Sequence, residues 1–135
     1  MGNRPTPEQI ARLMNEGPEG PIVMVNLLKF REHAGYDADK PEAKEKLSGR
    51  EAYQRYGMNV QPILVKLGAS LVWSGHQQLV VIGGANEEWD EVLCVRYPSR
   101  QTFLQMATSK EYSAIAYHRD AALERSALLC TVAAS

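Results

Sequence analysis

The sequence predicts an α+β domain in which two β-α-β units share one antiparallel sheet. Three observations carry this prediction: long apolar runs alternate with amphipathic segments, the helices begin at recognisable caps, and turn-forming residues separate the segments. The predicted order is a short helix followed by strand, helix, strand, strand, helix and strand, with an extra short hairpin arm in the middle. A β-α-β-β-α-β order of this kind is the ferredoxin-like arrangement.

The first helix is predicted over residues 7–16. Thr6 is a good N-cap, Pro7 occupies the favoured first position, and Gln9 completes a capping box. Gly17 ends the helix. We treat this helix as an N-terminal extension and the rest of the chain as the ferredoxin-like protomer, with a boundary between residues 1–18 and 19–135.

A nearly continuous apolar run, residues 21–30, predicts a central strand that is covered on both faces. The strongly polar residues 31–47 follow as a long connection, which either carries function or is mobile. Ser48 opens a second capping box and starts a helix whose apolar stripe has a spacing of 3.6 residues. Pro62 is expected to kink this helix or displace part of it, and Gly68 ends it.

Twenty residues between Lys66 and Glu87 carry no charge, which is the length of a membrane span. Four glycines and several polar side chains exclude a spanning helix, so we predict two strands instead, residues 69–74 and 77–82, around a turn at residues 74–75. We interpret this stretch as the middle of the sheet and as the place where two protomers touch.

A further strand is predicted over residues 91–97. Ser99 then caps a helix that breaks near Ser109 and continues with a second apolar stripe, and residues 127–132 form the last strand. Helices cover only one face of a sheet of this type, and no segment of the chain is left to cover the other. The economical solution is a second copy of the chain, sheet against sheet.

Composition excludes several classes of protein. The chain has 135 residues with a net charge of −1, so it lacks the basic surface of a nucleic-acid-binding protein. Two cysteines are too few for a disulfide framework, and we read Cys94 and Cys130 as small buried hydrophobic residues beyond disulfide reach. The first five residues carry no apolar signal region, so we expect a cytoplasmic protein without a membrane partner.

A hydrophobic strand that runs into a Tyr-Pro-Ser junction lies at Val95–Arg100, with Trp89–Val92 before it and Phe103 and Ser109–Tyr112 after it. Together with the strand Val23–Phe30, these segments resemble the uncharacterised family called domain of unknown function thirteen-thirty. The resemblance covers roughly residues 20–133 and implies a dimeric α/β barrel of two ferredoxin-like protomers. The wider superfamily includes cofactor-free monooxygenases, muconolactone isomerase-like enzymes, polyketide cyclases and haem-handling proteins, but the family itself supplies no catalytic residues.

Several polar residues interrupt apolar segments. Asn26 lies within a strand that should be buried, where its amide either faces a ligand or makes a structural hydrogen bond. Lys29 and Arg96 lie near strand ends, where each could hold an anionic group or pair with an acid. His118 is a candidate general base at the edge of a helix stripe, or a solvated residue. Arg119 lies near the centre of that stripe, where a structural ion pair is the favoured interpretation.

The first functional hypothesis is a homodimeric small-molecule-binding protein, with a cofactor-independent enzyme acting on an apolar organic acid or lactone as its most specific form. Its catalytic residues would be His118 and Arg96. Its ligand-binding residues would combine aromatic rings with polar tips: Asn26, Tyr53, Trp73, His76 and Tyr97. The alternatives are a non-catalytic ligand-binding or regulatory dimer, and a haem-associated protein with His76 or His118 as axial ligand. The histidines have no metal-ligand spacing, so no metal or other cofactor is expected.

Overall fold

The computed structural model describes residues 3–134, and the expectations for Met1 and Gly2 lie outside this range. Four strands form one antiparallel sheet in the order β2-β3-β1-β4. The strands are β1 (Ile22–Phe30), β2 (Ser70–His76), β3 (Glu91–Tyr97) and β4 (Leu123–Thr131). This strand order and the element order confirm the predicted ferredoxin-like fold.

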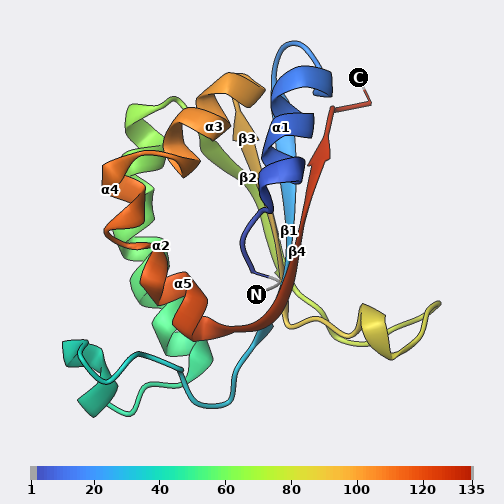
Figure 1. Cartoon of the computed structure of the whole chain (residues 1–135). Coiled ribbons are helices and arrows are strands. Elements are labelled where there is room, and N and C mark those ends of the chain that lie inside the picture. Colours follow the sequence, from blue (N-terminus) through green and yellow to red (C-terminus); the bar gives the residue numbers. More distant parts are fainter. Residues whose placement is uncertain (1–2, 135) are drawn as a thin grey trace.

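Five α-helices accompany the sheet: α1 (Pro7–Glu16), α2 (Gly49–Lys66), α3 (Arg100–Ala107), α4 (Lys110–Ser113) and α5 (Ala116–Ala122). Helices α2 to α5 form a layer over one face of the sheet, and the other face carries no element (Figure 1). Two short 3₁₀ helices, Pro41–Lys44 and Ala85–Glu87, lie in the connections. Within residues 3–134 no helix has both the length and the apolar character needed to cross a membrane.

The predicted N-terminal helix docks on the helix-covered side of the sheet. Ile10 and Leu13 pack against the core, and the capping box at Thr6 forms as predicted. Arg100 is buried and donates hydrogen bonds to the carbonyl oxygens of Met14 and Pro18, at 3.2 and 2.8 Å. This arginine therefore satisfies orphan carbonyls at the end of α1 and ties that helix to α3.

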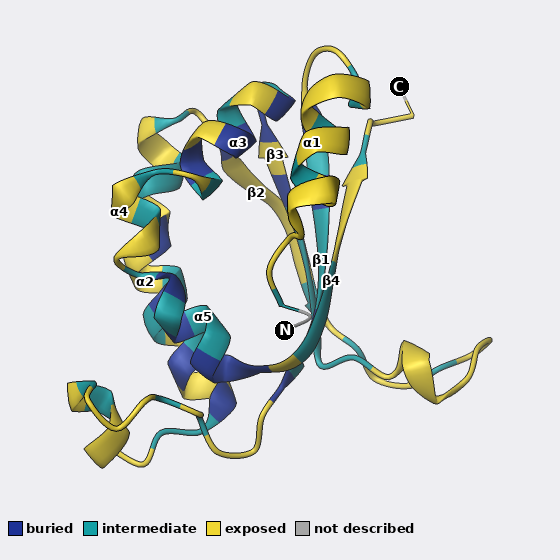
Figure 2. Ribbon diagram, viewed as in Figure 1, coloured by how far each residue is buried: buried dark blue, intermediate teal, exposed yellow. Residues whose placement is uncertain are grey.

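The interior is divided into two apolar halves. One half is built around the start of β1, and the other around its end (Figure 2). The first contains Ile22, Met24, Ala69, Val95, Tyr97, Phe103, Leu104 and Met106. The second contains Leu28, Phe30, Ala52, Ala122 and Leu123. Asn26 lies between the halves on the helix-facing side of β1, because Met24 and Leu28 are its neighbours at a spacing of two.

The segment between Lys66 and Glu91 differs from the prediction. Strand β2 runs through the expected turn at residues 74–75, and residues 77–82 form no strand. Gly75 lies within β2 and forms no turn. A glycine is needed at this position because a Cβ atom there would lie 2.6 Å from the Trp73 ring. The uncharged stretch is therefore an edge strand followed by a projecting loop, and not the middle of the sheet.

The boundaries of the helices and strands, and the burial of the cysteines, were only partly predicted. The break near Ser109 is confirmed, and α2 runs through Pro62 without interruption. Strand β4, however, begins at Leu123 and not at residue 127. Leu123 has no exposed surface and pairs with Phe30. Strand β4 therefore begins inside the second apolar half, where Leu123 is packed. Cys94 is half-buried, and Cys130 is exposed rather than buried.

The bare face of the sheet is largely apolar. Strand alternation and the observed register place there the side chains that point away from the helices. The middle of the face is apolar and contains Val23, Val25, Leu27, Trp73, Val92, Cys94, Ala127 and Leu129. Polar residues lie at its two ends, with Ser70, Arg96 and Thr131 at one and Lys29 and Arg125 at the other. Trp73 is 57% exposed and Leu129 is 49% exposed. An antiparallel sheet with one uncovered face normally alternates polar residues on that face, so this apolar face requires an explanation.

Candidate functional site

A belt of polar side chains separates the two apolar halves of the interior. We define the polar belt as Asn26 on β1, Tyr53 and Tyr56 on α2, Tyr112 on α4 and Arg119 on α5. Asn26 donates long hydrogen bonds of 3.4 and 3.3 Å to the carbonyl oxygens of Met24 and Leu93. Its Oδ1 atom accepts none within the described chain, so the amide is only partly satisfied by structural bonds.

The tyrosines of the polar belt are packed against one another. The rings of Tyr53 and Tyr56 lie 5.2 Å apart, and the hydroxyls of Tyr56 and Tyr112 share a hydrogen bond of 2.8 Å. Burial raises the pKa of Tyr53 to about 12, although the nearby charge of Arg119 opposes this shift. Burial also raises the pKa of Tyr56 well above its usual value. These hydroxyls are therefore neutral at pH 7 and can donate hydrogen bonds.

Arg119 brings a positive charge into this belt. Its Nη1 atom donates a hydrogen bond of 2.5 Å to the carbonyl oxygen of Asn3. The neighbouring acid, Asp120, pairs with Arg4 instead, and among residues 3–134 no carboxylate forms an ion pair with Arg119. The ion pair favoured from the sequence is therefore absent from the described chain. A guanidinium has five N–H donors, so this group keeps unused capacity for an anion.

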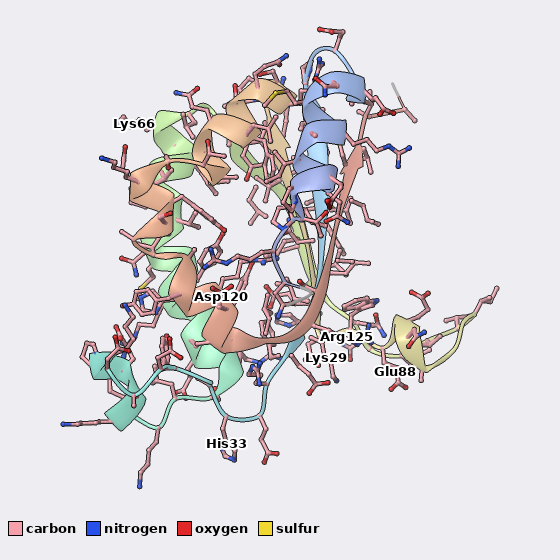
Figure 3. All side chains as sticks on the ribbon, in the orientation of Figure 1. Lys29, His33, Lys66, Glu88, Asp120 and Arg125 are labelled. Carbon is pink, nitrogen blue, oxygen red and sulfur yellow. The ribbon has the colours of Figure 1, made fainter. Side chains whose placement is uncertain are left out.

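The N-terminal segment closes over Arg119. The Asn3 amide donates to the Leu123 carbonyl oxygen at 3.2 Å, and the Ser126 hydroxyl donates to Asn3 Oδ1 at 2.7 Å. Arg4 adds its pair with Asp120, which is labelled on α5 in Figure 3. Side chains of α5 and β4 thus hold this segment in place.

His118 lies on the opposite side of α5, in a second polar group. We define the outer cluster as Tyr36 and Glu42 from the 31–47 connection with Tyr117 and His118 from α5. His118 is 5% exposed, its Nδ1 atom lies 2.6 Å from the Tyr36 hydroxyl, and its ring stacks on Tyr117 at 4.2 Å. The Tyr117 hydroxyl donates to Glu42 Oε2 at 3.0 Å, and His118 Nε2 lies 4.0 Å from the same oxygen.

The outer cluster shifts the titration of its members. Burial lowers the pKa of His118, and the charge of Glu42 partly opposes this shift. Burial and the same charge raise the pKa of Tyr36 to about 12. A neutral His118 accepts a hydrogen bond from the Tyr36 hydroxyl at Nδ1. Its own proton is then on Nε2, which faces Glu42. A recess of about 100 Å³ lies beside Tyr36 and Tyr117.

The residues predicted for one site are not brought together. Asn26 and Tyr53 belong to the polar belt, and Tyr97 is buried in the first apolar half, where its ring packs 5.2 Å from Phe103. His118 faces the outer cluster instead. The remaining three lie outside the interior. Arg96 and Trp73 are on the bare face, and His76 is exposed at the end of β2 with its Nε2 atom 3.3 Å from Glu91.

Sequence reasoning missed several members of both groups. Tyr36 and Glu42 belong to the long connection, and nothing in their spacing connects them with His118, about 80 residues away. Tyr56 is one of the buried core residues, and nothing in its position on α2 marks it as the partner of Tyr112, which lies 56 residues away. The one available signal was the position of Arg119 at the centre of an apolar stripe, where a charge is costly without a partner.

The geometry also bears on metal and haem binding. No group of three or more metal-ligating side chains occurs within the described residues. An iron atom bound by His118 would have to displace Tyr36 from Nδ1 or enter between Nε2 and Glu42. An iron atom bound by His76 would compete with Glu91.

Lys29 was predicted either to hold an anion or to pair with an acid. In the structure its Nζ atom lies 3.6 Å from Asp90 Oδ1.

Known structures with the same fold include two of one protein, RPA0582. The chain is 34% identical to methylated RPA0582 over 100% of this chain and 98% of the other, with a TM-score of 0.89. A second structure is described as a protein of unknown function from Rhodopseudomonas palustris. It is 37% identical over 94% of this chain and 92% of the other, with a TM-score of 0.83.

More distant structures share the fold alone. A dabb family protein with a ferredoxin-like fold from Mesorhizobium loti is 10% identical over 86% of this chain and 99% of the other, with a TM-score of 0.53. No curated protein matches the chain. The family model for DUF1330, a domain of unknown function, matches residues 43–133. This match, together with the similarity to RPA0582 over nearly the whole chain, shows that the protein belongs to the DUF1330 family.

Proposed function

We propose that this protein is a homodimeric binding protein for an apolar organic acid, which the polar belt holds by its carboxylate. The observation that carries this proposal is the Arg119 guanidinium, which lies among neutral tyrosines and has no carboxylate partner within the described chain. A positive charge in such a place is compensated when an anion arrives.

The chemistry of the belt suits a carboxylate on an apolar body. A guanidinium binds a carboxylate through two parallel N–H···O bonds, and neutral tyrosine hydroxyls add further donors. Asn26 Oδ1 is an acceptor for a ligand hydroxyl or amide. The interior on either side of the belt is apolar, which favours an apolar body on the acid. Simple binding and cofactor-independent turnover both begin with this complex, and product analysis separates them.

The bare face of the sheet supports the dimer. It is apolar across its middle, it runs across all four strands, and no element within residues 3–134 covers it. Contiguous exposed apolar surface of this kind marks interaction sites. A second copy would present the same face, so one patch would serve both sides of a two-fold interface.

Titration calorimetry of the full chain with benzoate, cinnamate and octanoate tests the proposed ligand class, with benzamide and octanol as neutral counterparts. We expect at least one acid to bind more than tenfold more tightly than its neutral counterpart. Arg119→Gln should weaken the binding of that acid about 10- to 100-fold, because hydrogen bonds to charged groups contribute about 1.5–3 kcal/mol. Arg12→Gln is the matched control, because Arg12 is exposed on α1.

Equal binding of acids and neutral compounds would contradict the proposed role of Arg119, and so would unchanged binding in Arg119→Gln. Absence of binding across the whole panel would contradict the proposed ligand class. A separate measurement of mass in solution tests the dimer, and a stable monomer at micromolar concentrations would contradict it.

A further inference from the structure

Residues 77–90 project from the end of the sheet as a loop, which we call the arm. The arm extends away from the body of the molecule, next to the start of β4 and on the side away from α2 and α5 (Figure 1). The bare face and the arm are continuous, because Leu27 of the bare face also lines the groove formed by the arm.

The base of the arm is firmly held. Arg125 of β4 lies 4.0 Å above the Trp89 ring and donates hydrogen bonds to the carbonyl oxygens of Asn86 and Glu88, at 2.9 and 2.7 Å. Lys29, Arg125 and Glu88 gather where the arm leaves the sheet (Figure 3). The Asp90 N–H donates to the Leu28 carbonyl oxygen at 2.7 Å. The arm is therefore attached to the sheet in a defined orientation.

The tip of the arm is apolar and unpartnered. Leu79, Val81 and Ile82 are 69%, 85% and 93% exposed, which places Val81 and Ile82 among the most exposed large hydrophobic residues of the described chain. Within that same part of the chain, the backbone groups of residues 79–82 make no hydrogen bond. An apolar segment with free backbone donors and acceptors resembles an exposed strand edge, which is a site for pairing with another chain.

A groove of about 480 Å³ runs along the arm. Its lining combines the apolar arm with neighbouring side chains, which are Leu27, Gln77, Leu79, Val80, Val81, Ile82, Gly83, Glu87 and Trp89. The Trp89 Nε1 atom is buried and has no hydrogen-bond partner. A buried indole N–H without an acceptor is costly. This atom is not open to the groove, so the observation that bears on the occupant is the mostly apolar lining, which suits an apolar segment.

We infer that the groove receives the arm of a second copy, so that two protomers exchange arms across the two-fold axis. This inference rests on the dimer proposed above. Residues 79–82 of the partner would supply the apolar side chains that fill the groove. Because a two-fold interface is self-complementary, one contact of this kind generates the second.

The area involved supports a second copy. Burying one aliphatic side chain removes roughly 60–120 Å² from water, as the transfer energies of such side chains imply. Three side chains of the arm therefore contribute roughly 180–360 Å² per protomer, against about 800 Å² per partner in a standard interface. The arm alone is too small for a stable complex, and the adjoining bare face supplies the remaining area.

Sedimentation equilibrium of the full chain tests the arm exchange. The double variant Val81→Ser/Ile82→Ser should raise the dissociation constant of the dimer at least about 100-fold, because each protomer loses two buried aliphatic side chains. The matched control is Met58→Ser/Val65→Ser, which removes two similarly exposed hydrophobic residues from α2. The control should change the dissociation constant less than about threefold, since surface substitutions away from an interface have small effects.

Cysteine crosslinking identifies the occupant of the groove. In a Cys94→Ser/Cys130→Ser background, which removes both native thiols, we expect at least one of Leu79→Cys, Val81→Cys and Ile82→Cys to form an intermolecular disulfide under mild oxidation. Val65→Cys in the same background should form none. Peptide mapping of the linked species should place the bond between the two arms.

The possible outcomes separate the two proposals. A monomeric wild-type protein overturns the dimer and the arm exchange together. A wild-type dimer that the arm variant leaves unchanged overturns the arm exchange while the sheet-to-sheet dimer stands. An arm variant that weakens the dimer without any crosslink between arms overturns the groove as the docking place, because the arm then contacts another part of the partner or the groove holds a different ligand.

Discussion

His118 and Arg119 are adjacent on α5, but they differ in how fully their polar atoms are partnered. The contrast concerns these two residues, because within the outer cluster the buried Glu42 Oε1 atom has no hydrogen-bond partner in the described chain. On the outer side, the His118 ring meets Tyr36, Tyr117 and Glu42, and its Nδ1 atom has a short hydrogen bond. On the inner side, Arg119 brings five donors and a charge. It donates to the Asn3 carbonyl oxygen and lies within hydrogen-bonding reach of the Tyr53 hydroxyl, and neither partner carries a negative charge. The residues are adjacent in sequence, but they face different surroundings.

The difference changes how each residue is interpreted. From the sequence, His118 was the candidate base and Arg119 a structural charge. In the structure, packing and hydrogen bonds account for the burial of His118 without any ligand, whereas nothing in the described chain neutralises Arg119. A catalytic role for His118 stays a prediction. The lesson is that an unused donor indicates a ligand better than a reactive residue type does.

Gly49→Ala should have the largest effect, because it disrupts the attachment of the outer cluster. A methyl group at Gly49 would overlap the Arg31 carbonyl oxygen and lie 2.6 Å from that of Ala122. We expect a loss of about 3 kcal/mol in the free energy of unfolding, measured by urea denaturation. Gly57→Ala on the same helix has open space, so it should be neutral or stabilising by up to about 1 kcal/mol. Equal effects would contradict the close approach at Gly49.

Tyr36→Phe tests the short hydrogen bond of the outer cluster. The variant leaves the buried Nδ1 atom of His118 without its donor, so stability should fall by about 1–3 kcal/mol. Tyr117→Phe is the comparison on the same ring stack, and its smaller effect is expected because Tyr117 is only half-buried. If Tyr36→Phe were as stable as the wild type, the outer cluster would not be a closed structural network.

The pH dependence of stability provides a third test. The pKa of His118 is lowered in the folded state, mainly by burial, from an ordinary value of 6.5. As the pH falls below about 6.5 the unfolded chain takes up a proton first, so folding stability should decrease, with a slope of at most about 1.4 kcal/mol per pH unit. His118→Asn keeps an acceptor for Tyr36 and removes this titration. The wild type should therefore lose more stability between pH 7 and pH 5 than the variant, and parallel profiles would contradict a buried neutral His118.

Arg119→Met should have the smallest effect on stability, although it should remove acid binding. The variant replaces an uncompensated charge by an apolar side chain of similar length, so the free energy of unfolding should change by less than about 1 kcal/mol or increase. The lost bond to the Asn3 carbonyl oxygen opposes this gain. A loss above about 3 kcal/mol would show that Arg119 has a structural partner, and the contrast between the two sides of α5 would fail.

Much of the fold could be predicted from local signals. Capping boxes at Thr6 and Ser48 located the first residues of α1 and α2, and the apolar run before Arg31 located β1. Errors arose where local and tertiary preferences disagree. Gly75 resembles a turn residue but provides space for the Trp73 ring, and Leu123 continues a helical stripe but is paired in β4.

The candidate site was predicted less well than the fold. Asn26 and Tyr53 were identified because a polar group inside an apolar strand or helix stripe can be recognised from the sequence alone. Their convergence with Tyr112 and Arg119 depends on how three helices pack over β1, and no spacing within a single element encodes that packing. The partners of His118 lie about 80 residues away, in a connection without regular periodicity.

The sequence by itself determined the order of the elements, the ferredoxin-like arrangement and the apolar character of the sheet, because capping, periodicity and turn chemistry act over a few residues. The tertiary structure decided which polar groups are satisfied and which are left with free donors. It also decided that the uncharged segment after β2 forms a projecting arm. Both depend on contacts between residues far apart in the chain, where packing and desolvation outweigh local propensity.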